Sequence, residues 1–348
     1  MKLTSIRLAI LGAASLVGGA GSIAACGGDD TTTGTTPKDA GNDTTTVTDT
    51  GGGGSDTSPP PDTAPPPDAA GFDAGDASTS RGEYLVKHLL LCGGCHNQPG
   101  DGGAFLGGGR AFPIALADGG DGGAVYARNL TPDGTGLQGW TVQQIATAIR
   151  TGSALGRPLF PIMPYAIFGN LTEEDAFSIA LYLQSLPATT NAVPPPTASV
   201  AQAAPVLDFS TIIPHTTLDG GGDASDFNAA ERGRYLVGLG CFDCHTPRNG
   251  GARDLTKVLG GGRVFGAHQS DNLTPDPTGL AAWTNDDIVA ALKTAQRPND
   301  GGTICPPMPS KAGTFGGLTD GDLADLATYV HTLPPVANGP FDDGGACN

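Results

Sequence analysis

The stretch Cys92-Gly93-Gly94-Cys95-His96 returns later in the chain as Cys241-Phe242-Asp243-Cys244-His245. Other segments recur around it in one order: Arg81–Val86 as Arg232–Val237, Leu106–Phe112 as Leu259–Phe265, Asn129–Asp133 as Asn272–Asp276, Trp140-Thr141 as Trp283-Thr284, and Met163-Pro164 as Met308-Pro309. Matched segments in the same order indicate an internal duplication. The sequence therefore predicts two homologous domains, at 81–190 and 228–336, joined by a linker at 191–227 and followed by a tail at 337–348.

Both domains read as short helices joined by glycine-rich loops. Apolar residues recur at helical spacing, as in Leu323, Leu326 and Val330. Capping-box spacing precedes such runs at Thr141 with Gln144, Thr172 with Asp175, Thr284 with Asp287, and Thr319 with Asp322. No strand alternation is visible. The predicted fold class is therefore mainly α, in two tandem domains.

Composition limits what the chain can be. Its 348 residues include 55 Gly and 29 Pro and carry a net charge of −17. That charge argues against nucleic-acid binding, which needs basic patches. Residues 27–80 are almost wholly Gly, Asp, Thr, Pro, Ala and Ser. Such a segment has little to bury, so it is predicted to be a disordered tether.

The first 26 residues are typical of an export signal. Lys2 and Arg7 precede an apolar run that is too short and too rich in glycine for a stable membrane span. The run ends at Ile23-Ala24-Ala25-Cys26, which resembles a bacterial lipoprotein processing site. We expect Cys26 to be lipidated and to anchor the exported protein on the periplasmic side of a bacterial membrane. The alternative is an ordinary secretory signal with an unrelated cysteine.

The repeated Cys-x-x-Cys-His is the attachment signature of c-type haem. The two thiols bind the haem covalently, and the adjacent imidazole binds the iron. The sequence thus predicts two covalently attached haems, held by Cys92 and Cys95 and by Cys241 and Cys244, with His96 and His245 as proximal iron ligands. A redox dithiol or half of a zinc site are the alternatives. The carbonyls of Pro99 and Pro247, or neighbouring ones, are candidates to accept the imidazole N–H.

The methionines complete the predicted iron sites. The chain has 3 Met, of which two, Met163 and Met308, lie at matching places in the repeat. We expect them to be the distal thioether ligands, since His/Met ligation suits electron transfer. The alternative is that both fill gaps in the core.

Several other residues have weaker assignments. Arg110 and Arg263 are candidates to bind haem propionates. Trp140 and Trp283 are candidates to donate indole N–H groups to them, with plain packing as the alternative for all four residues. Cys305 and Cys347 are left over, and export favours a disulfide between them.

At family level, the repeats resemble class I cytochrome c domains, and more closely the cytochrome c subunits of bacterial membrane-bound alcohol, aldehyde and gluconate dehydrogenases. The similar segments are Asn129–Trp140, Ile162–Tyr165 and Thr172–Asp175. The resemblance implies a carrier, with no catalytic residue of its own, that relays single electrons from a periplasmic donor such as a dehydrogenase to a respiratory acceptor. Those subunits commonly carry three haem domains, and this chain has two.

Two other functions remain open on the sequence. One is a di-haem redox enzyme of the peroxidase or thiosulfate dehydrogenase type, in which Cys305 would ligate the second iron as a thiolate, as in some thiosulfate-oxidising enzymes. The matched methionines argue against an open iron. The other is a haem-based sensor, for which no output domain is visible.

Overall fold

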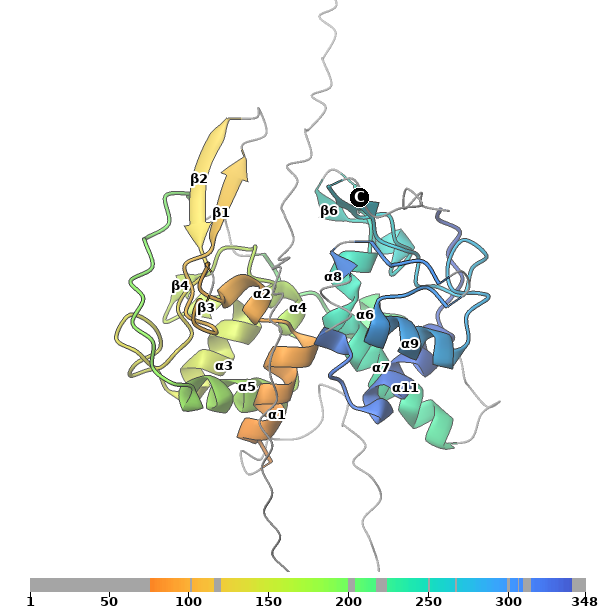
Figure 1. Ribbon diagram of the computed structural model, residues 1–348, viewed down its shortest axis with the longest axis horizontal. Helices are drawn as coiled ribbons and strands as arrows, with labels where there is room; N and C mark the ends of the chain where they lie inside the picture. The colour runs from red at the N-terminus through yellow and green to blue at the C-terminus, as the bar shows by residue number, and fades with distance from the viewer. Residues whose placement is uncertain are drawn as a thin grey trace, which may run out of the picture.

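The structure is a computed structural model that describes residues 76–100, 102–115, 120–199, 204–216, 224–249, 251–266, 268–298, 301–305, 307–308 and 314–339. The expected signal with Cys26, the tether up to residue 75, and Cys347 lie outside these residues. The described chain forms two helical bodies side by side (Figure 1). We call residues 76–199 the N-terminal half, 204–216 the connecting segment, and 224–339 the C-terminal half.

The predicted mainly helical fold is confirmed. In the N-terminal half the helices are α1 (Thr79–Tyr84), η1 (Leu85–Leu89), α2 (Gly93–His96), α3 (Val142–Thr151), α4 (Tyr165–Phe168) and α5 (Glu173–Ser185). The connecting segment holds α6 (Phe209–Ile212). The C-terminal half has α7 (Ala224–Gly240), α8 (Phe242–His245), η2 (Leu255–Lys257), α9 (Asn285–Thr294) and α11 (Asp320–Val330).

Helix α1 begins at Thr79, and α7 begins at Ala224. Residues 79–80, which were expected in the tether, are therefore helical. Residues 224–227, the end of the expected linker, are helical as well.

Four threonines cap the helices where the sequence predicts. Thr141 and Thr284 form complete capping boxes with Gln144 and Asp287. Thr172 and Thr319 cap α5 and α11 through the backbone N–H of Asp175 and Asp322. In these two helices the aspartate side chain does not return to the cap but bonds elsewhere, as described below.

Short antiparallel hairpins interrupt the loops, although no strand alternation is visible in the sequence. The strands are β1 (Ala111–Ala115) with β2 (Asp121–Tyr126), β3 (Ser153–Ala154) with β4 (Arg157–Pro158), β5 (Arg248–Asn249) with β6 (Ala252–Arg253), and β7 (Val264–Phe265) with β8 (His268–Gln269). In the longest hairpin Phe112 pairs with Val125, and both are buried. The others have two residues per strand, which is too few for alternation to be visible.

The first and last helices of each half cross at a glycine. A Cβ at Gly82 in α1 would lie 1.9 Å from the carbonyl oxygen of Ser178 in α5. A Cβ at Gly233 in α7 would lie 2.0 Å from the carbonyl oxygen of Asp325 in α11. The repeated Arg-Gly-x-Tyr segment thus places the same close helix contact in both halves.

The N-terminal half has two more residues than the C-terminal half between this segment and the first cysteine, since Leu85 to Cys92 matches Leu236 to Cys241. The π-helix η1 lies in this interval, and its wider turn takes up extra chain. Leu91, with φ 54°, then turns the chain into α2. The attachment motif therefore follows a helix in both halves despite the different lengths.

Each half ends in a segment that returns to the glycine loop ahead of a hairpin, which is β1–β2 in the N-terminal half and β7–β8 in the C-terminal half. Asn191 donates from Nδ2 to the carbonyl oxygens of Gly107 and Gly108, at 2.9 and 3.1 Å. Asn338 makes the same bonds to Gly260 and Gly261, at 3.0 and 3.2 Å. The matched structure of the halves thus runs one residue past the predicted boundary at 190 and two past that at 336.

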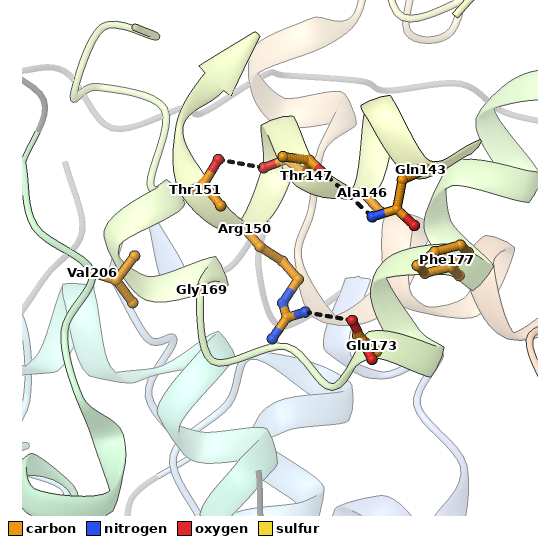
Figure 2. Close-up of a pocket in the computed structure, with 9 residues that line it drawn as sticks. All are labelled: Gln143, Ala146, Thr147, Arg150, Thr151, Gly169, Glu173, Phe177 and Val206. Carbon is orange, nitrogen blue, oxygen red and sulfur yellow. Dashed lines mark hydrogen bonds and ion pairs between the residues drawn. The ribbon is translucent and has the colours of Figure 1, made fainter. Parts of the chain in front are cut away.

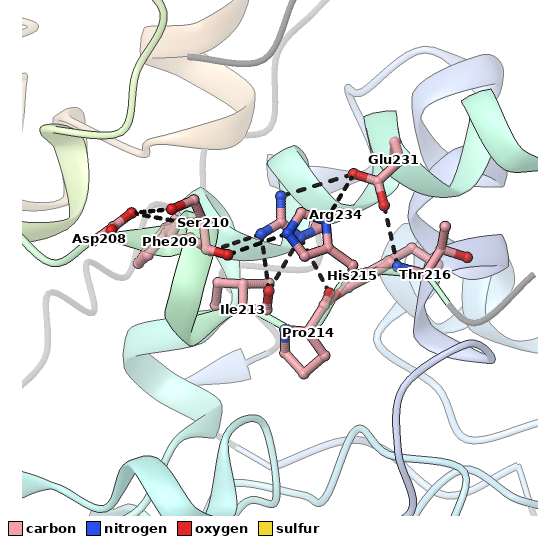
Figure 3. Close-up of polar contacts among 10 residues, drawn as sticks. Asp208, Phe209, Ser210, Ile213, Pro214, His215, Thr216, Glu231 and Arg234 are labelled. Atoms are coloured by element: carbon pink, nitrogen blue, oxygen red, sulfur yellow. Dashed lines mark hydrogen bonds and ion pairs between the residues drawn. The ribbon is translucent and has the colours of Figure 1, made fainter. Parts of the chain in front are cut away.

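The connecting segment is anchored to both halves. Asn170 donates to the carbonyl of Leu207 at 2.7 Å, and its Oδ1 accepts from the N–H of Phe209 at 3.0 Å. On the other side Arg234 of α7 donates to the carbonyls of Phe209, Ile213 and Pro214 (Figure 3). The guanidinium therefore satisfies the carbonyls of Ile213 and Pro214 just beyond the end of α6, and it shares the carbonyl of Phe209 with the N–H of Ile213.

Candidate functional site

The attachment motifs form single helical turns. In α2 the N–H of His96 donates to the carbonyl of Cys92 at 2.8 Å, and in α8 His245 donates to Cys241 at 2.9 Å. Each hydrogen bond spans four residues, so the two cysteines of a motif lie close to one turn apart. This arrangement agrees with the spacing that the sequence predicts.

The two imidazoles are oriented by backbone carbonyls. Nδ1 of His96 lies 2.8 Å from the carbonyl oxygen of Arg128, and Nδ1 of His245 lies 2.8 Å from that of Asp271. A carbonyl only accepts, so each Nδ1 carries the proton and Nε2 keeps its lone pair for a metal. The nearby carbonyls favoured from the sequence, those of Pro99 and Pro247, are not the acceptors. The fold instead brings the carbonyl groups of Arg128 and Asp271, which are more distant in the sequence, to the two imidazoles.

Both histidines are held neutral. Burial lowers the pKa of His96, and the hydrogen bond to Arg128 opposes that shift. Burial likewise lowers the pKa of His245, against the bond to Asp271. A neutral imidazole is the form that binds a metal.

Closely packed glycines hold the two loops that carry the acceptor carbonyls in place. Gly108 donates to the carbonyl of His96, and Gly261 donates to that of His245, both at 2.7 Å. A Cβ on either glycine would lie 2.5 Å from the backbone nitrogen of Asn129 or Asn272, and both glycines have positive φ, 76° and 74°. Only glycine fits this close approach. The repeated Gly-Gly-Gly-Arg segment thus holds the Arg128 and Asp271 peptide units against the histidines.

Both methionines lie against the main apolar core. Met163 and Met308 are partly buried and pack on the cluster that Cys92 and Cys241 also contact. Ile162, next to Met163, packs with Cys95 on a second cluster of Phe112, Val125, Ala127 and Ala198. Cys92 and Met163 thus both pack on the main apolar core, and their neighbours Cys95 and Ile162 both pack on the second cluster. The iron–thioether bond itself stays a prediction.

The cysteines differ in their bonding. Cys92, Cys241 and Cys244 are thiols that take no part in a disulfide. Burial raises the pKa of Cys92 and of Cys241 to about 12. Cys95 and Cys305 each take part in a disulfide. The proposed partner of Cys305, Cys347, lies outside the described residues, so that pairing stays a prediction.

Arg110 and Arg263 bind the backbone of the attachment motifs. Nη1 of Arg110 donates to the carbonyl of Gly94 at 2.6 Å, and Nη1 of Arg263 donates to that of Asp243 at 2.6 Å. Each guanidinium therefore supports the turn between two cysteines. The other N–H groups of each guanidinium can donate to a haem propionate, and this contact with the propionate stays a prediction.

Asp243 makes the second motif electrostatically different from the first, where Gly94 stands. Arg248, Arg253 and Arg263 all bond its carboxylate. Burial would raise the pKa of Asp243, but these three guanidiniums outweigh burial and lower it to about 2. The carboxylate is thus charged at neutral pH and fastens three arginines around the second attachment turn.

Trp140 and Trp283 are partly buried and pack against the main core. The carbonyl of Trp140 accepts from Nε2 of Gln184 at 2.6 Å, which joins its loop to α5. These contacts show packing, and an indole N–H bond to a haem propionate stays a prediction.

The donor set fits a covalently bound haem on chemical grounds: two sulfurs about one turn apart, a neutral imidazole with a lone pair on Nε2, and a thioether in the same core. The disulfide at Cys95 is the feature that does not fit, because a thioether needs that sulfur as a thiol. Haem attachment and this disulfide exclude each other.

A pocket away from the attachment motifs is lined by other residues. It measures about 270 Å³ and lies between α3, α5 and the connecting segment (Figure 2). Nη1 of Arg150 lies 3.8 Å from Oε1 of Glu173 in its wall. The predicted haem residues do not line this pocket.

In the part of the chain that the structure describes, no helix is both long enough and apolar enough to cross a membrane.

Comparison with known proteins places this site in a family. The Cytochrome c family profile matches residues 230–334. The chain is 30% identical over 277 residues to the fructose dehydrogenase cytochrome subunit of Gluconobacter japonicus, covering 75% of this chain and 53% of that protein. It is 29% identical over 306 residues to the cytochrome c subunit of alcohol dehydrogenase (quinone) of Gluconobacter oxydans, covering 78% and 59%.

A third relative is matched over most of its length. The diheme cytochrome c-type protein of Cereibacter sphaeroides is 30% identical over 271 residues, which cover 74% of this chain and 86% of that protein. The chain therefore belongs to the cytochrome c family, and a cytochrome c domain carries covalently bound haem c. The prediction of an electron carrier rather than a catalytic subunit is confirmed, because these relatives are cytochromes or cytochrome subunits. The chain spans little more than half the length of the two dehydrogenase subunits.

Proposed function

We propose that the protein is a di-haem c-type cytochrome with two tandem class I domains, which relays single electrons between a periplasmic donor and a respiratory acceptor. The observation that carries the proposal is the matched pair of histidines, each with Nδ1 2.8 Å from a backbone carbonyl and each following two cysteines in one helical turn. The same donor set is thus built twice in one chain.

The chain's own residues bind and orient. Cys92 with Cys95, and Cys241 with Cys244, would hold the two haems, and His96 and His245 would take the proximal position. Met163 and Met308 would close the opposite position. When bound, haem supplies the one-electron chemistry, and the protein supplies ligands, orientation and a dry setting. With both positions closed, no side chain needs to act as acid or base.

We further propose a dehydrogenase as the electron donor. The relatives named as cytochrome subunits of fructose dehydrogenase and of alcohol dehydrogenase (quinone) support this assignment. A lipid on Cys26 and the tether would hold the carrier at the periplasmic face of a membrane, near its acceptor. Changing Cys26 to Ser tests the anchor: the variant should leave the membrane fraction, and a variant that stays there overturns lipidation.

Spectroscopy of the purified full chain tests the proposal. We expect two haems per chain, both low-spin when oxidised, with the methionine-to-iron charge-transfer band. Carbon monoxide and cyanide should bind poorly because both axial positions are filled. Ready binding of either, or a high-spin signal, would instead favour a di-haem enzyme of the peroxidase or thiosulfate dehydrogenase type.

A further inference from the structure

We propose that Tyr84 and Tyr235 are positioning residues that lock the two halves of the protein in one fixed orientation. Each tyrosine comes from the first helix of one half and bonds the start of the last helix of the other half. The two contacts use equivalent residues of the repeat.

The first contact joins α1 to α11. The hydroxyl of Tyr84 donates to Oδ2 of Asp322 at 2.5 Å. The hydroxyl oxygen of Tyr84 also accepts the backbone N–H of Thr319, the N-cap of α11, at 3.1 Å.

The second contact is its counterpart and joins α7 to α5. The hydroxyl of Tyr235 donates to Oδ2 of Asp175 at 2.6 Å. It accepts the backbone N–H of Thr172, the N-cap of α5, at 3.3 Å. Tyr84 and Tyr235 share the Arg-Gly-x-Tyr segment, and both aspartates lie three residues after the capping threonine. The contact is therefore of the isologous kind that relates two copies by a two-fold axis.

Comparison with the other capped helices shows what the tyrosines do. In α3 and α9 the side chains of Gln144 and Asp287 accept the N–H of their own N-cap residue, at 2.9 and 2.8 Å. In α5 and α11 a tyrosine hydroxyl from the other half stands between the aspartate and that N–H. The capping box of each last helix is thus completed across the boundary between the halves.

This arrangement ties orientation to hydrogen bonding. A phenol that donates to a carboxylate makes a charge-assisted bond, which is stronger and more directional than a neutral one. Asp175 is 4% exposed and also accepts two bonds from Arg81, at 2.7 and 3.0 Å, so it is fixed within its own half. A rotation of one half against the other would open both capping boxes.

Close contacts between the halves leave little room for other arrangements. A Cβ at Gly240 would lie 3.2 Å from Cδ1 of Leu89, and one at Gly317 would lie 2.2 Å from the ring of His88. Nδ1 of His88 lies 3.0 Å from the carbonyl oxygen of Thr314. The connecting segment also contacts the C-terminal half, where Phe209 packs edge-on against Phe242 in the second attachment turn, with ring centroids 5.1 Å apart.

The consequence for electron exchange rests on the proposed function. Two haems carried by halves in one orientation would keep one separation and one mutual angle, so they would exchange electrons at a single rate. The orientation itself depends only on residues of this chain.

The double variant Tyr84→Phe/Tyr235→Phe tests the lock in the full-length holoprotein. Nitrogen-15 NMR relaxation of the two halves in the reduced protein is the primary measurement, because it reports tumbling and not electron transfer. In the wild type both halves should tumble as one body with one rotational correlation time. In the double variant each half should tumble separately and faster, and inter-haem electron exchange should become slower and multiphasic.

Two controls separate the lock from general destabilisation. Tyr126→Phe removes a hydroxyl from strand β2, and Gln144→Leu opens a capping box within one half; both should keep the common correlation time. If the double variant does not fold, the two single variants, each with one contact left, replace it and should show a reduced coupling of the halves. A common correlation time unchanged in all these variants overturns the proposal. A wild type with fewer than two haems overturns the proposed function, while the relaxation result still decides the lock.

Discussion

The imidazole of His96 is held by the backbone of Arg128, whose carbonyl oxygen lies 2.8 Å from Nδ1. His245 has the same relationship to Asp271. Since the acceptor is a main-chain atom, an arginine in one half and an aspartate in the other serve equally well. What the repeat must preserve is the loop that presents the carbonyl, and the glycines that lock this loop recur in both halves.

Cys95 should carry a haem thioether in the mature protein rather than the disulfide. We expect a peptide spanning Cys92–His96 to be recovered with covalent haem, and a Cys95→Ser variant to retain haem through Cys92 alone. Mass spectrometry of proteolytic peptides measures both. Recovery of Cys95 in a disulfide from the holoprotein would contradict attachment at the first motif.

Met163→Leu and Met308→Leu should each remove about half of the methionine-to-iron charge-transfer band, because each variant removes one thioether. Leucine keeps most of the side-chain volume, so the fold should tolerate the change. The potential of the affected haem should fall, since methionine ligation raises it. Absorption spectroscopy and a redox titration measure these effects. A band that stays intact in either variant would reassign that methionine to the core.

Gly82→Ala and Gly233→Ala should each destabilise the protein by about 3 kcal/mol, because overpacking forces the crossing helices apart. The new Cβ would lie 1.9 or 2.0 Å from a carbonyl oxygen of the partner helix. Gly321→Ala is the matched control in α11, where the nearest atom to a new Cβ is 3.9 Å away. The control should be neutral or stabilising by up to about 1 kcal/mol. Denaturant unfolding compares the three, and equal effects would show that the crossing is not tight.

The Tyr84 contact should weaken at high pH. Burial, followed by the bond to Asp322, raises the pKa of Tyr84 from 10.0 to about 12. A raised pKa in the folded state contributes stability that is full below pH 10 and is lost as the pH rises towards 12. The charged and titratable groups facing the phenol are Asp322 from α11, with Arg81 and His88 from its own chain segment.

The free energy of unfolding measured from pH 9 to 12 checks this expectation. The wild type should lose more stability than Tyr84→Phe over that range, since the variant has no phenol to ionise. Parallel pH profiles for the two proteins would show that the contact contributes nothing.

Structural features that depend on residues close together in the sequence could be predicted. The single turns at Cys92–His96 and Cys241–His245 and the threonine caps depend on residues a few positions apart, and the structure contains them. Features that depend on tertiary contacts could not be predicted. The acceptor carbonyl of Arg128 lies 32 residues from His96, and no side-chain type marks a main-chain acceptor. The two-residue strands are shorter than the pattern that would show them.

The tyrosines illustrate the same limit. Tyr84 and Tyr235 stand in the repeated segment, so their matching positions are visible in the sequence. Their partners are not, because Asp322 lies 238 residues from Tyr84 and in the other half. Repetition shows that a residue matters twice; it does not show whether each copy serves its own half or the other one.

The exchanged contacts also bear on how such a chain can diverge. In a symmetric pair of identical subunits, one substitution changes both copies of a contact at once. Within a single duplicated chain each copy mutates alone, and the protein already uses this freedom. Arg81 pairs with Asp175, the aspartate that also receives Tyr235, whereas its counterpart Arg232 pairs with Asp325, one turn further along its helix. Asp322 accepts the hydroxyl of Tyr84, while the arginine of its own half bonds Asp325 instead. Because the two contacts are made by different residues of one chain, each of them can change without the other.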